Sequence, residues 1–330
     1  MIKKLLLVLL FSYPEFSYSD INVEFDIWLK KFKVTALEEG ISEKTINNSL
    51  KNTKYLEQVI KYDRYQPEFF EDTKTYIKKR ATRSRTQKAK ILLTKNKKLF
   101  EEIEKKFKVE KEILLALWGI ETNFGDHVGK MDIISSLATL SFDKRRSKFF
   151  SKELIILLKL IDQKLIDADT LYGSWAGAFG NFQFMPSTIA NYAIDYDQNN
   201  KIELKESFHD AIASAANYIN KIGWKYKSLC FYKVELTKPI SNKNINTSAK
   251  KINNFHTIQS WKKKGIVEIE HISDKNKAAL VIPDLAFNEN NEKSPAFLVF
   301  ENYEKILKWN RSLRFGITVC TLANMIKDEN

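Results

Sequence analysis

The stretch VEKEILLALWGIETNFGDHVG, residues 109–129, decides how the rest of the chain is interpreted. Residues 113–120 are almost entirely apolar, which predicts a helix buried on nearly all sides. The Asn-Phe-Gly sequence that follows is a helix stop signal, with Gly125 expected just beyond the helix. Glu121 therefore lies in or near the last helical turn.

Glu121 has two interpretations at this position. The negative end of the helix dipole and the apolar neighbours both disfavour the charged carboxylate, so we expect a raised pKa. A carboxyl group that keeps its proton is what general acid catalysis requires. The alternative is an exposed glutamate on a frayed helix end, and shifted acids also occur in structural networks.

The composition is that of a globular protein with a strongly basic surface. The chain has 330 residues, 44% of them hydrophobic, and a net charge of +13. Such a charge indicates either an anionic partner or a lysine-rich proteome. We favour the second, with affinity for the cell wall as a by-product. No base-reading basic helix or aromatic stacking platform stands out, so we expect no nucleic-acid partner.

The N-terminal segment predicts export. Lys3-Lys4 precede a short apolar run at 5–11, and Ser17-Tyr18-Ser19 supplies small residues for a signal peptidase, so residues 1–19 are interpreted as a cleaved signal peptide. The run is too short to span a bilayer, and we expect a periplasmic protein without a stable membrane anchor. An uncleaved anchor is the alternative.

The two cysteines leave two possibilities open. In an oxidising compartment Cys230 and Cys320 can form one bridge, but two buried free thiols fit the sequence equally well.

Several sequence blocks resemble the lytic murein transglycosylases of the membrane-bound lytic transglycosylase B type. They are DRYQPEF at 63–69, WGIETNFG at 118–125, LATLSF at 137–142, GSWAGAFG at 173–180 and QFMPS at 183–187. Their order and spacing make the resemblance cover roughly residues 24–228.

The resemblance implies a peptidoglycan-cleaving enzyme with one catalytic carboxyl. Glu121 would act as acid and then as base on the bond between N-acetylmuramic acid and N-acetylglucosamine, giving 1,6-anhydromuramyl products without consuming water. Ser174 would orient Glu121, Gln183 would bind the glycan and Met185 would lie on the cleft floor. No cofactor is required for this chemistry. A hydrolytic muramidase and a non-catalytic peptidoglycan-binding protein remain the alternatives.

Further candidate glycan-binding residues lie outside these catalytic positions. Arg145 and Arg146 could hold a carboxylate or remain surface charges. Tyr62 and Gln66, in a Pro-interrupted aromatic stretch interpreted as a loop, suit sugar binding but also ordinary loop packing. Trp309-Asn310 resembles a family block in which an aromatic–Asn pair faces the substrate; the aromatic there is usually Tyr, and Trp309 would stack on a sugar without offering a hydroxyl.

Residues 195–206 resemble an EF-hand loop. Oxygen-bearing side chains recur at alternate positions, as a hard cation requires, and Asn200 replaces the usual glycine. A structural Ca²⁺ or Na⁺ is expected there, and a polar turn without metal is the alternative. The predicted ligands are Asp195, Asp197, Asn199, the carbonyl of Lys201, and Glu206.

The predicted fold class is α+β, mainly α. A lysozyme-like catalytic core at 109–228 follows a helical N-terminal region at 20–108. Short apolar segments at 230–236, 266–270, 278–282 and 296–300 predict a small β-rich insertion at 229–300. The C-terminal segment 301–330 contains an apolar helix that returns to the core. Peptidoglycan glycan strands are the expected partner, and the resemblance also allows cell-wall synthesis enzymes.

Overall fold

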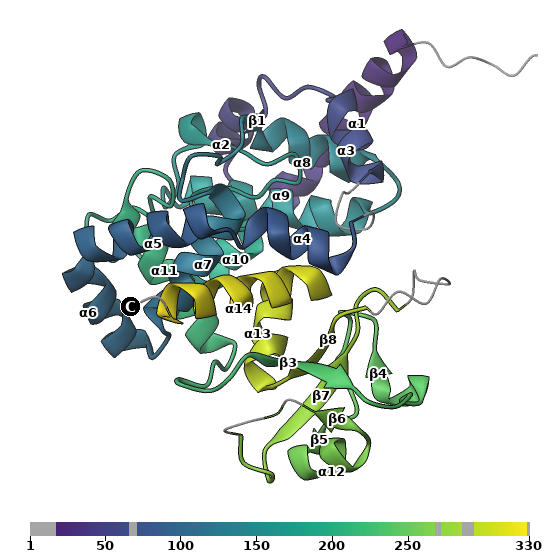
Figure 1. The fold of residues 1–330 in the computed structure, drawn as a ribbon. Helices are drawn as coiled ribbons and strands as arrows, with labels where there is room; N and C mark the ends of the chain where they lie inside the picture. Colours follow the sequence, from purple (N-terminus) through teal and green to yellow (C-terminus); the bar gives the residue numbers. More distant parts are fainter. Residues whose placement is uncertain (1–17, 66–70, 268, 270–271, 286–293, 329–330) are drawn as a thin grey trace, which may run out of the picture.

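Helix α7 (Lys111–Thr122) lies in the middle of the helical body (Figure 1). The structure is a computed structural model, and it describes residues 18–65, 71–267, 269, 272–285 and 294–328. The residues of α7 from Ile113 to Gly119 are all buried, as the apolar run predicts. The helices packed around it are α5 (Arg83–Lys95), α6 (Lys97–Phe107), α11 (Phe208–Lys221) and α14 (Leu313–Asp328).

The N-terminal region forms helices, as expected from its spacing. They are α1 (Tyr18–Glu38), α2 (Glu43–Ser49), α3 (Glu57–Arg64) and α4 (Thr73–Arg80). Ser42 caps α2 by accepting a hydrogen bond from the backbone N–H of Thr45. Tyr62 belongs to α3 and not to a loop, because a proline at position 67 disfavours helix only for residues close to it.

The centre of the chain places two helices beside a small two-stranded sheet. Helices α8 (Ile133–Phe142) and α9 (Ser147–Asp162) pack on each other, and α10 (Pro186–Tyr192) packs on α9. Strands β1 (Met131–Asp132) and β2 (Tyr172–Gly173) pair antiparallel before and after them, with the short helix η2 (Ala168–Thr170) just before β2. This pairing brings the glycine-rich segment at 173–180 back towards the end of α7.

A second sheet follows α11 in the sequence. Its strand order is β4-β7-β8-β3-β6, with β5 also paired to β7. The four segments predicted as strands overlap β3 (Phe231–Leu236), β6 (Ile266–Val267), β7 (Lys277–Val281) and β8 (Ala296–Val299). The remaining elements are η3 (Asn242–Asn244), β4 (Ile245–Asn246), β5 (His256–Thr257) and α12 (Ile258–Lys263). One face of the sheet packs around fully buried Trp261, apart from the main core.

Two C-terminal helices join this sheet to the helical body. Helix α13 (Glu301–Trp309), which the sequence did not predict, leads into α14, and Figure 1 shows both between the sheet and the helices above it. A disulfide between Cys230 and Cys320 ties the start of β3 to α14, so the bridge and not the pair of free thiols is present. Among the described helices, none combines the length and apolar character needed to cross a membrane.

Candidate active site

The C-terminal end of α7 places Glu121 in the last helical turn, as the sequence predicts. The helix ends earlier than expected from Gly125, because Asn123 and Phe124 already adopt left-handed backbone conformations with φ of 52° and 62°. The Phe124 N–H then donates to the Trp118 carbonyl, which closes the helix end. A Cβ at Gly119 would lie 2.7 Å from the Phe124 ring, so the glycine allows this ring to pack on the helix.

Two basic residues of α5 hold the same helix end. The Arg85 Nε donates to the Asn123 side-chain oxygen at 3.2 Å, and the Lys88 Nζ donates to the Asn123 carbonyl at 3.1 Å and to Asp126 at 2.6 Å. Lysine suits this position because cations are favoured at the negative end of a helix dipole. The sequence offered no signal for these contacts, since 75–108 is uniformly rich in Lys and Arg.

The indole of Trp309 reaches the candidate acid directly. Its Nε1–H donates to Oε1 of Glu121 at 2.9 Å, and both side chains are half-buried. The Trp309 ring is stacked on Tyr218 with centroids 5.1 Å apart, and Phe184 meets it at a steep angle at 5.2 Å. The family resemblance predicts that Trp309 faces the substrate, and this stays a prediction. The structure adds a contact with Glu121 that the sequence did not reveal.

The side chain of Ser174 folds back onto the backbone of its own glycine-rich segment. The Ser174 hydroxyl oxygen accepts hydrogen bonds from the backbone N–H groups of Ala176 and Ala178, at 3.3 and 3.0 Å. Gly177 adopts φ of 85° at this turn, beside the side chain of Leu137. With both acceptor positions engaged, the hydroxyl proton is left for donation. That it is donated to Glu121 stays a prediction.

Gln183 and Met185 lie in the turn that leads into α10. Gln183 adopts φ of 50°, and its amide nitrogen donates to the carbonyls of Val128 and Gly180 at 3.1 and 2.9 Å. Its amide oxygen is therefore the group suited to accept a hydrogen bond from a sugar hydroxyl. Met185 is the residue before α10 and packs against the core.

Asn181 is a connecting residue that the sequence analysis missed. Its side-chain oxygen accepts the indole N–H of Trp118 at 3.0 Å, and its amide nitrogen donates to the carbonyls of Leu204 and Lys205 at 3.1 and 3.0 Å. Its backbone carbonyl accepts the Thr122 hydroxyl at 2.8 Å. Asn181 thus joins the helix that carries Glu121 to the end of the EF-hand-like loop. The one available signal was an asparagine within an otherwise glycine–aromatic segment.

The arginine pair lies in the turn between α8 and α9, where its side chains bind a buried aspartate. Arg145 donates to the side chain and to the carbonyl of Asp63, and Arg146 pairs with the other carboxylate oxygen. Burial alone would raise the pKa of Asp63, but hydrogen bonds from Arg145 and Arg146 hold that pKa below its ordinary value. The glycan-binding role of the pair stays a prediction.

The other predicted glycan-binding residues lie on separate elements. Tyr62 projects from α3 with 44% of its surface exposed. Gln66 lies outside the described residues. Asn310 follows α13, and its backbone N–H donates to the Ile306 carbonyl at 3.1 Å.

The EF-hand-like loop gathers three carboxylates, one of them unforeseen. Oxygens of Asp195, Asp197 and Asp210 lie within 4.8 Å of one another. Burial raises the pKa of the Asp210 carboxyl, because the charged carboxylate loses hydration. A bound cation would compensate for that loss. The left-handed conformation expected at Asn200 is present, with φ of 67°.

The remaining predicted ligands lie in the same loop, and Glu206 is not one of the three clustered carboxylates. The Asn199 side-chain oxygen accepts the backbone N–H of Lys201 at 2.9 Å. Glu206 is exposed and lies 3.7 Å from the Lys205 ammonium group. Three clustered carboxylates are a donor set that fits a hard cation.

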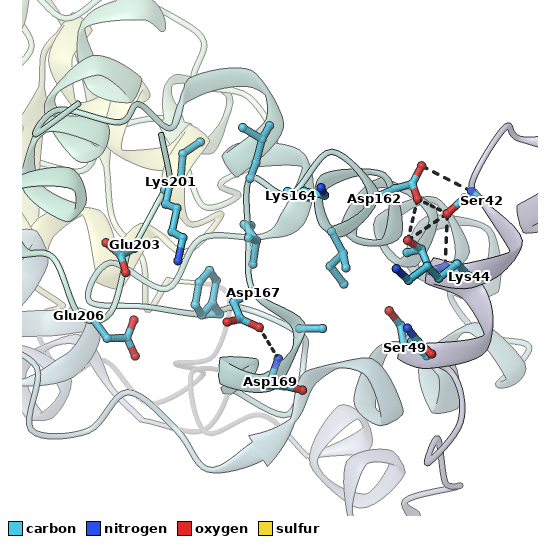
Figure 2. Close-up of a pocket in the computed structure, with 18 residues that line it drawn as sticks. Ser42, Lys44, Ser49, Asp162, Lys164, Asp167, Asp169, Lys201, Glu203 and Glu206 are labelled. Atoms are coloured by element: carbon cyan, nitrogen blue, oxygen red, sulfur yellow. Dashed lines mark hydrogen bonds between the residues drawn. The ribbon is translucent and has the colours of Figure 1, made fainter. Parts of the chain in front are cut away.

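A cavity of about 550 Å³ lies between α2 and this loop. Figure 2 shows Lys201, Glu203 and Glu206 on one side, Ser42, Lys44 and Asp162 on the other, and Asp167 and Asp169 between them. Its walls carry both charge signs. Glu121 and the candidate glycan-binding residues are not among its lining residues. The cavity is therefore separate from the end of α7.

The chain resembles known proteins over most of its length. The transglycosylase SLT domain family matches residues 24–324. The membrane-bound lytic murein transglycosylase B of Escherichia coli strain K12 is 43% identical over 117 residues, 35% of this chain and 32% of that protein. The matched segment thus spans about a third of this curated relative.

Solved structures share the fold. SltB3 from Pseudomonas aeruginosa in complex with NAG-NAM-pentapeptide has a TM-score of 0.82 at 29% identity, covering 92% of this chain and 79% of that chain. The lytic transglycosylase Slt35 of Escherichia coli in complex with calcium has a TM-score of 0.76 at 24% identity, covering 95% of each chain. These likenesses confirm the predicted resemblance and fold class. The chain therefore belongs to the transglycosylase SLT domain family and has the mostly helical, lysozyme-like fold of lytic transglycosylases.

Proposed function

We propose that this protein is a peptidoglycan lytic transglycosylase with Glu121 as its single acid and base. The observation that carries the proposal is the half-buried Glu121 carboxyl at the end of a buried helix, held by the Trp309 indole at 2.9 Å. Support also comes from SltB3, whose structures contain NAG-NAM-pentapeptide and NAG-anhNAM-pentapeptide. The second ligand carries the anhydro sugar that the proposed reaction forms.

The reaction balances without water. The Glu121 carboxyl donates its proton to the oxygen that bridges N-acetylmuramic acid and N-acetylglucosamine, and the bond from that oxygen to C1 of the muramyl sugar breaks. The Glu121 carboxylate then takes the proton of the muramyl C6 hydroxyl while that oxygen bonds to C1. The products are a 1,6-anhydromuramyl end and a free N-acetylglucosamine end.

The first two carboxylates that follow Glu121 in the sequence have structural partners. A hydrogen bond from Lys88 holds the pKa of Asp126 below its ordinary value. Asp132 caps α8 by accepting the backbone N–H of Ser135 at 2.6 Å. Both carboxylates already bind other groups of the protein, so neither is well suited to act as a second catalytic carboxylate. This favours a one-carboxyl mechanism over the two-carboxylate arrangement of ordinary glycosidases.

The test is digestion of purified murein sacculi by residues 20–330, with products identified by mass spectrometry. We expect 1,6-anhydromuramyl muropeptides from the wild type and none from Glu121→Gln. Glu110→Gln is the matched control, because Glu110 precedes α7 at its other end and binds Trp224 there. Reducing ends one water heavier would indicate a muramidase. Binding without cleavage by wild type and Glu121→Gln alike would indicate a wall-binding protein.

The remaining candidate residues take supporting roles in this proposal. Ser174 orients Glu121, and Met185 lines the cleft floor. The residues that hold the glycan are Gln183, Arg145, Arg146, Asn310, Trp309, Tyr62 and Gln66. Single alanine substitutions are expected to raise KM for soluble muropeptides where the residue binds glycan, and to lower kcat for Ser174→Ala.

We further propose that the EF-hand-like loop holds a structural Ca²⁺. Asp195, Asp197 and Asp210 supply clustered carboxylates, with Asn199, the Lys201 carbonyl and Glu206 as additional ligands. The Slt35 structure with calcium supports the proposal. Thermal unfolding of the wild type should shift upward with added Ca²⁺, whereas Asp195→Ala should abolish the shift. An equal response of both proteins would refute a site in this loop, and a response to Na⁺ alone would identify the other cation.

The proposed location is the periplasm, where peptidoglycan lies. It is supported by the signal-peptide pattern at 1–19, of which 1–17 lie outside the described residues. The same proposal divides the mature chain into 20–108, 109–228, 229–300 and 301–330, and allows cell-wall synthesis enzymes as partners. Fractionation of cells that produce the full chain tests the location.

A further inference from the structure

We propose that Trp309 is a positioning residue for the acid: its indole N–H holds Oε1 of Glu121, so that Oε2 carries the transferred proton. This inference rests on the proposed role of Glu121. The contact joins residues 188 positions apart, at the ends of α7 and α13.

The chemistry of the two groups decides which oxygen is protonated. An indole nitrogen can only donate, so the group that faces it must accept. In a neutral carboxyl the carbonyl oxygen is a better acceptor than the hydroxyl oxygen. The carbonyl character therefore stays on Oε1, 2.9 Å from Nε1, and the proton belongs on Oε2. Glu121 can pass through its acid and base states while one oxygen remains fixed.

Trp309 is itself held in place from two sides. Its ring stacks on Tyr218 and meets Phe184, with centroids 5.1 and 5.2 Å away. The Tyr218 hydroxyl donates to the Lys308 carbonyl at 3.1 Å, which anchors the last turn of α13. Because burial raises the pKa of Tyr218 to about 12, this anchor stays neutral over the working pH range. A rigid donor of this kind can hold a carboxyl in one rotamer.

Four charged residues on helices that pack on α7 have polar partners other than Glu121. Arg85 binds Asn123, and Lys88 binds Asn123 and Asp126. Glu104 pairs with Lys111, and Arg314 pairs with Asp284. Loss of the Trp309 hydrogen bond should therefore change the titration of Glu121.

The first readout is the titration of the contact itself. The indole ¹H–¹⁵N signal of Trp309 in the wild type, identified by its loss in Trp309→Phe, should shift between pH 3 and 8. Its midpoint should equal that of the Glu121 carboxyl ¹³C signal, and the shift should vanish in Glu121→Gln. An indole signal that does not follow Glu121 would overturn the proposal. This readout does not depend on turnover. It therefore shows whether the hydrogen bond between Trp309 and Glu121 exists even if the wild type fails to cleave sacculi and the proposed function is refuted.

The second readout compares two variants that lose an indole N–H bonded to a glutamate. Trp309→Phe removes the donor that stabilises the ionised acid, so the Glu121 titration and the alkaline limb of kcat/KM should both move up by about one pH unit. We expect kcat to fall about tenfold and KM to change less than about twofold. Trp224→Phe is the control, because the Trp224 Nε1–H binds Glu110 at 2.6 Å beside the other end of α7.

The outcomes separate positioning from other roles. Equal stability losses, with a pH shift only in Trp309→Phe, would support positioning. An increase in KM without a change in kcat or in the pH profile would make Trp309 only a sugar-stacking surface and overturn the proposal. If Trp309→Phe does not fold, the signal is identified instead as the indole signal whose shift between pH 3 and 8 vanishes in Glu121→Gln, and the absence of any such signal would overturn the proposal.

Discussion

Replacing Asn181 with alanine should destabilise the protein and disturb Glu121 together. The Asn181 side chain is buried and makes three hydrogen bonds, one with the indole of Trp118 and two with the carbonyls of Leu204 and Lys205. A buried hydrogen bond contributes about 1 kcal/mol net, and unpaired buried partners add to the cost, so we expect a loss of about 3–4 kcal/mol in the free energy of unfolding.

Asn246 offers a matched control in the second sheet. Its buried side chain also makes three hydrogen bonds, two with Asn253 and one with the Leu280 carbonyl. Asn246→Ala should cost a similar free energy of unfolding but leave kcat/KM on muropeptides close to wild type, because β4 lies apart from α7. Asn181→Ala should lower kcat/KM about tenfold or more, since it releases the turn that binds the end of α7.

Urea unfolding followed by circular dichroism measures the stability of both variants, and muropeptide release measures their activity at a temperature where both are folded. A loss below 0.5 kcal/mol for Asn181→Ala, on the order of an ordinary surface substitution, would refute the hydrogen-bond argument. Equal activity losses in Asn181→Ala and Asn246→Ala would refute the specific connection to Glu121.

Three further predictions concern stability. Asp63→Asn should lower the free energy of unfolding by about 2 kcal/mol at pH 7, because it removes a buried carboxylate from partly exposed arginines. Since the pKa of Asp63 is lowered in the folded state, this stabilisation is present above the unfolded pKa and is lost as the pH falls through the folded pKa. The denaturation curves of the two proteins should therefore begin to converge below about pH 4, and a constant difference would contradict this. Gly119→Ala should lower the free energy of unfolding by about 1–2 kcal/mol, despite the better helix propensity of alanine, because the added Cβ would lie 2.7 Å from the Phe124 ring. Thermal unfolding measures this, and a gain in stability would show that the ring moves aside. Reduction of the Cys230–Cys320 bridge should lower the free energy of unfolding by about 2–5 kcal/mol because it releases a constraint across a sequence separation of 90, and an unchanged urea midpoint in Cys230→Ser/Cys320→Ser would refute this.

Local patterns in the sequence were sufficient for the elements of the fold and for several of the site's positions. The buried run at 113–120 predicted α7 and the place of Glu121 in its last turn, because helix burial and termination depend on neighbouring residues. The alternation of acidic residues at 195–197 likewise predicted a loop that gathers carboxylates. The short apolar segments after residue 229 predicted strands for the same reason.

The tertiary structure decided which of these residues meet. The indole that binds Glu121 comes from 188 residues away, and Asp210 joins the acidic loop from α11. Asp63, on α3, binds the arginine pair in the turn between α8 and α9. The sequence also left the pairing of Cys230 with Cys320 open. Each of these contacts joins segments separated along the chain, and their distance depends on how whole helices pack. Residue spacing predicts the face on which a side chain lies, whereas its partner is set by the packing of the element opposite.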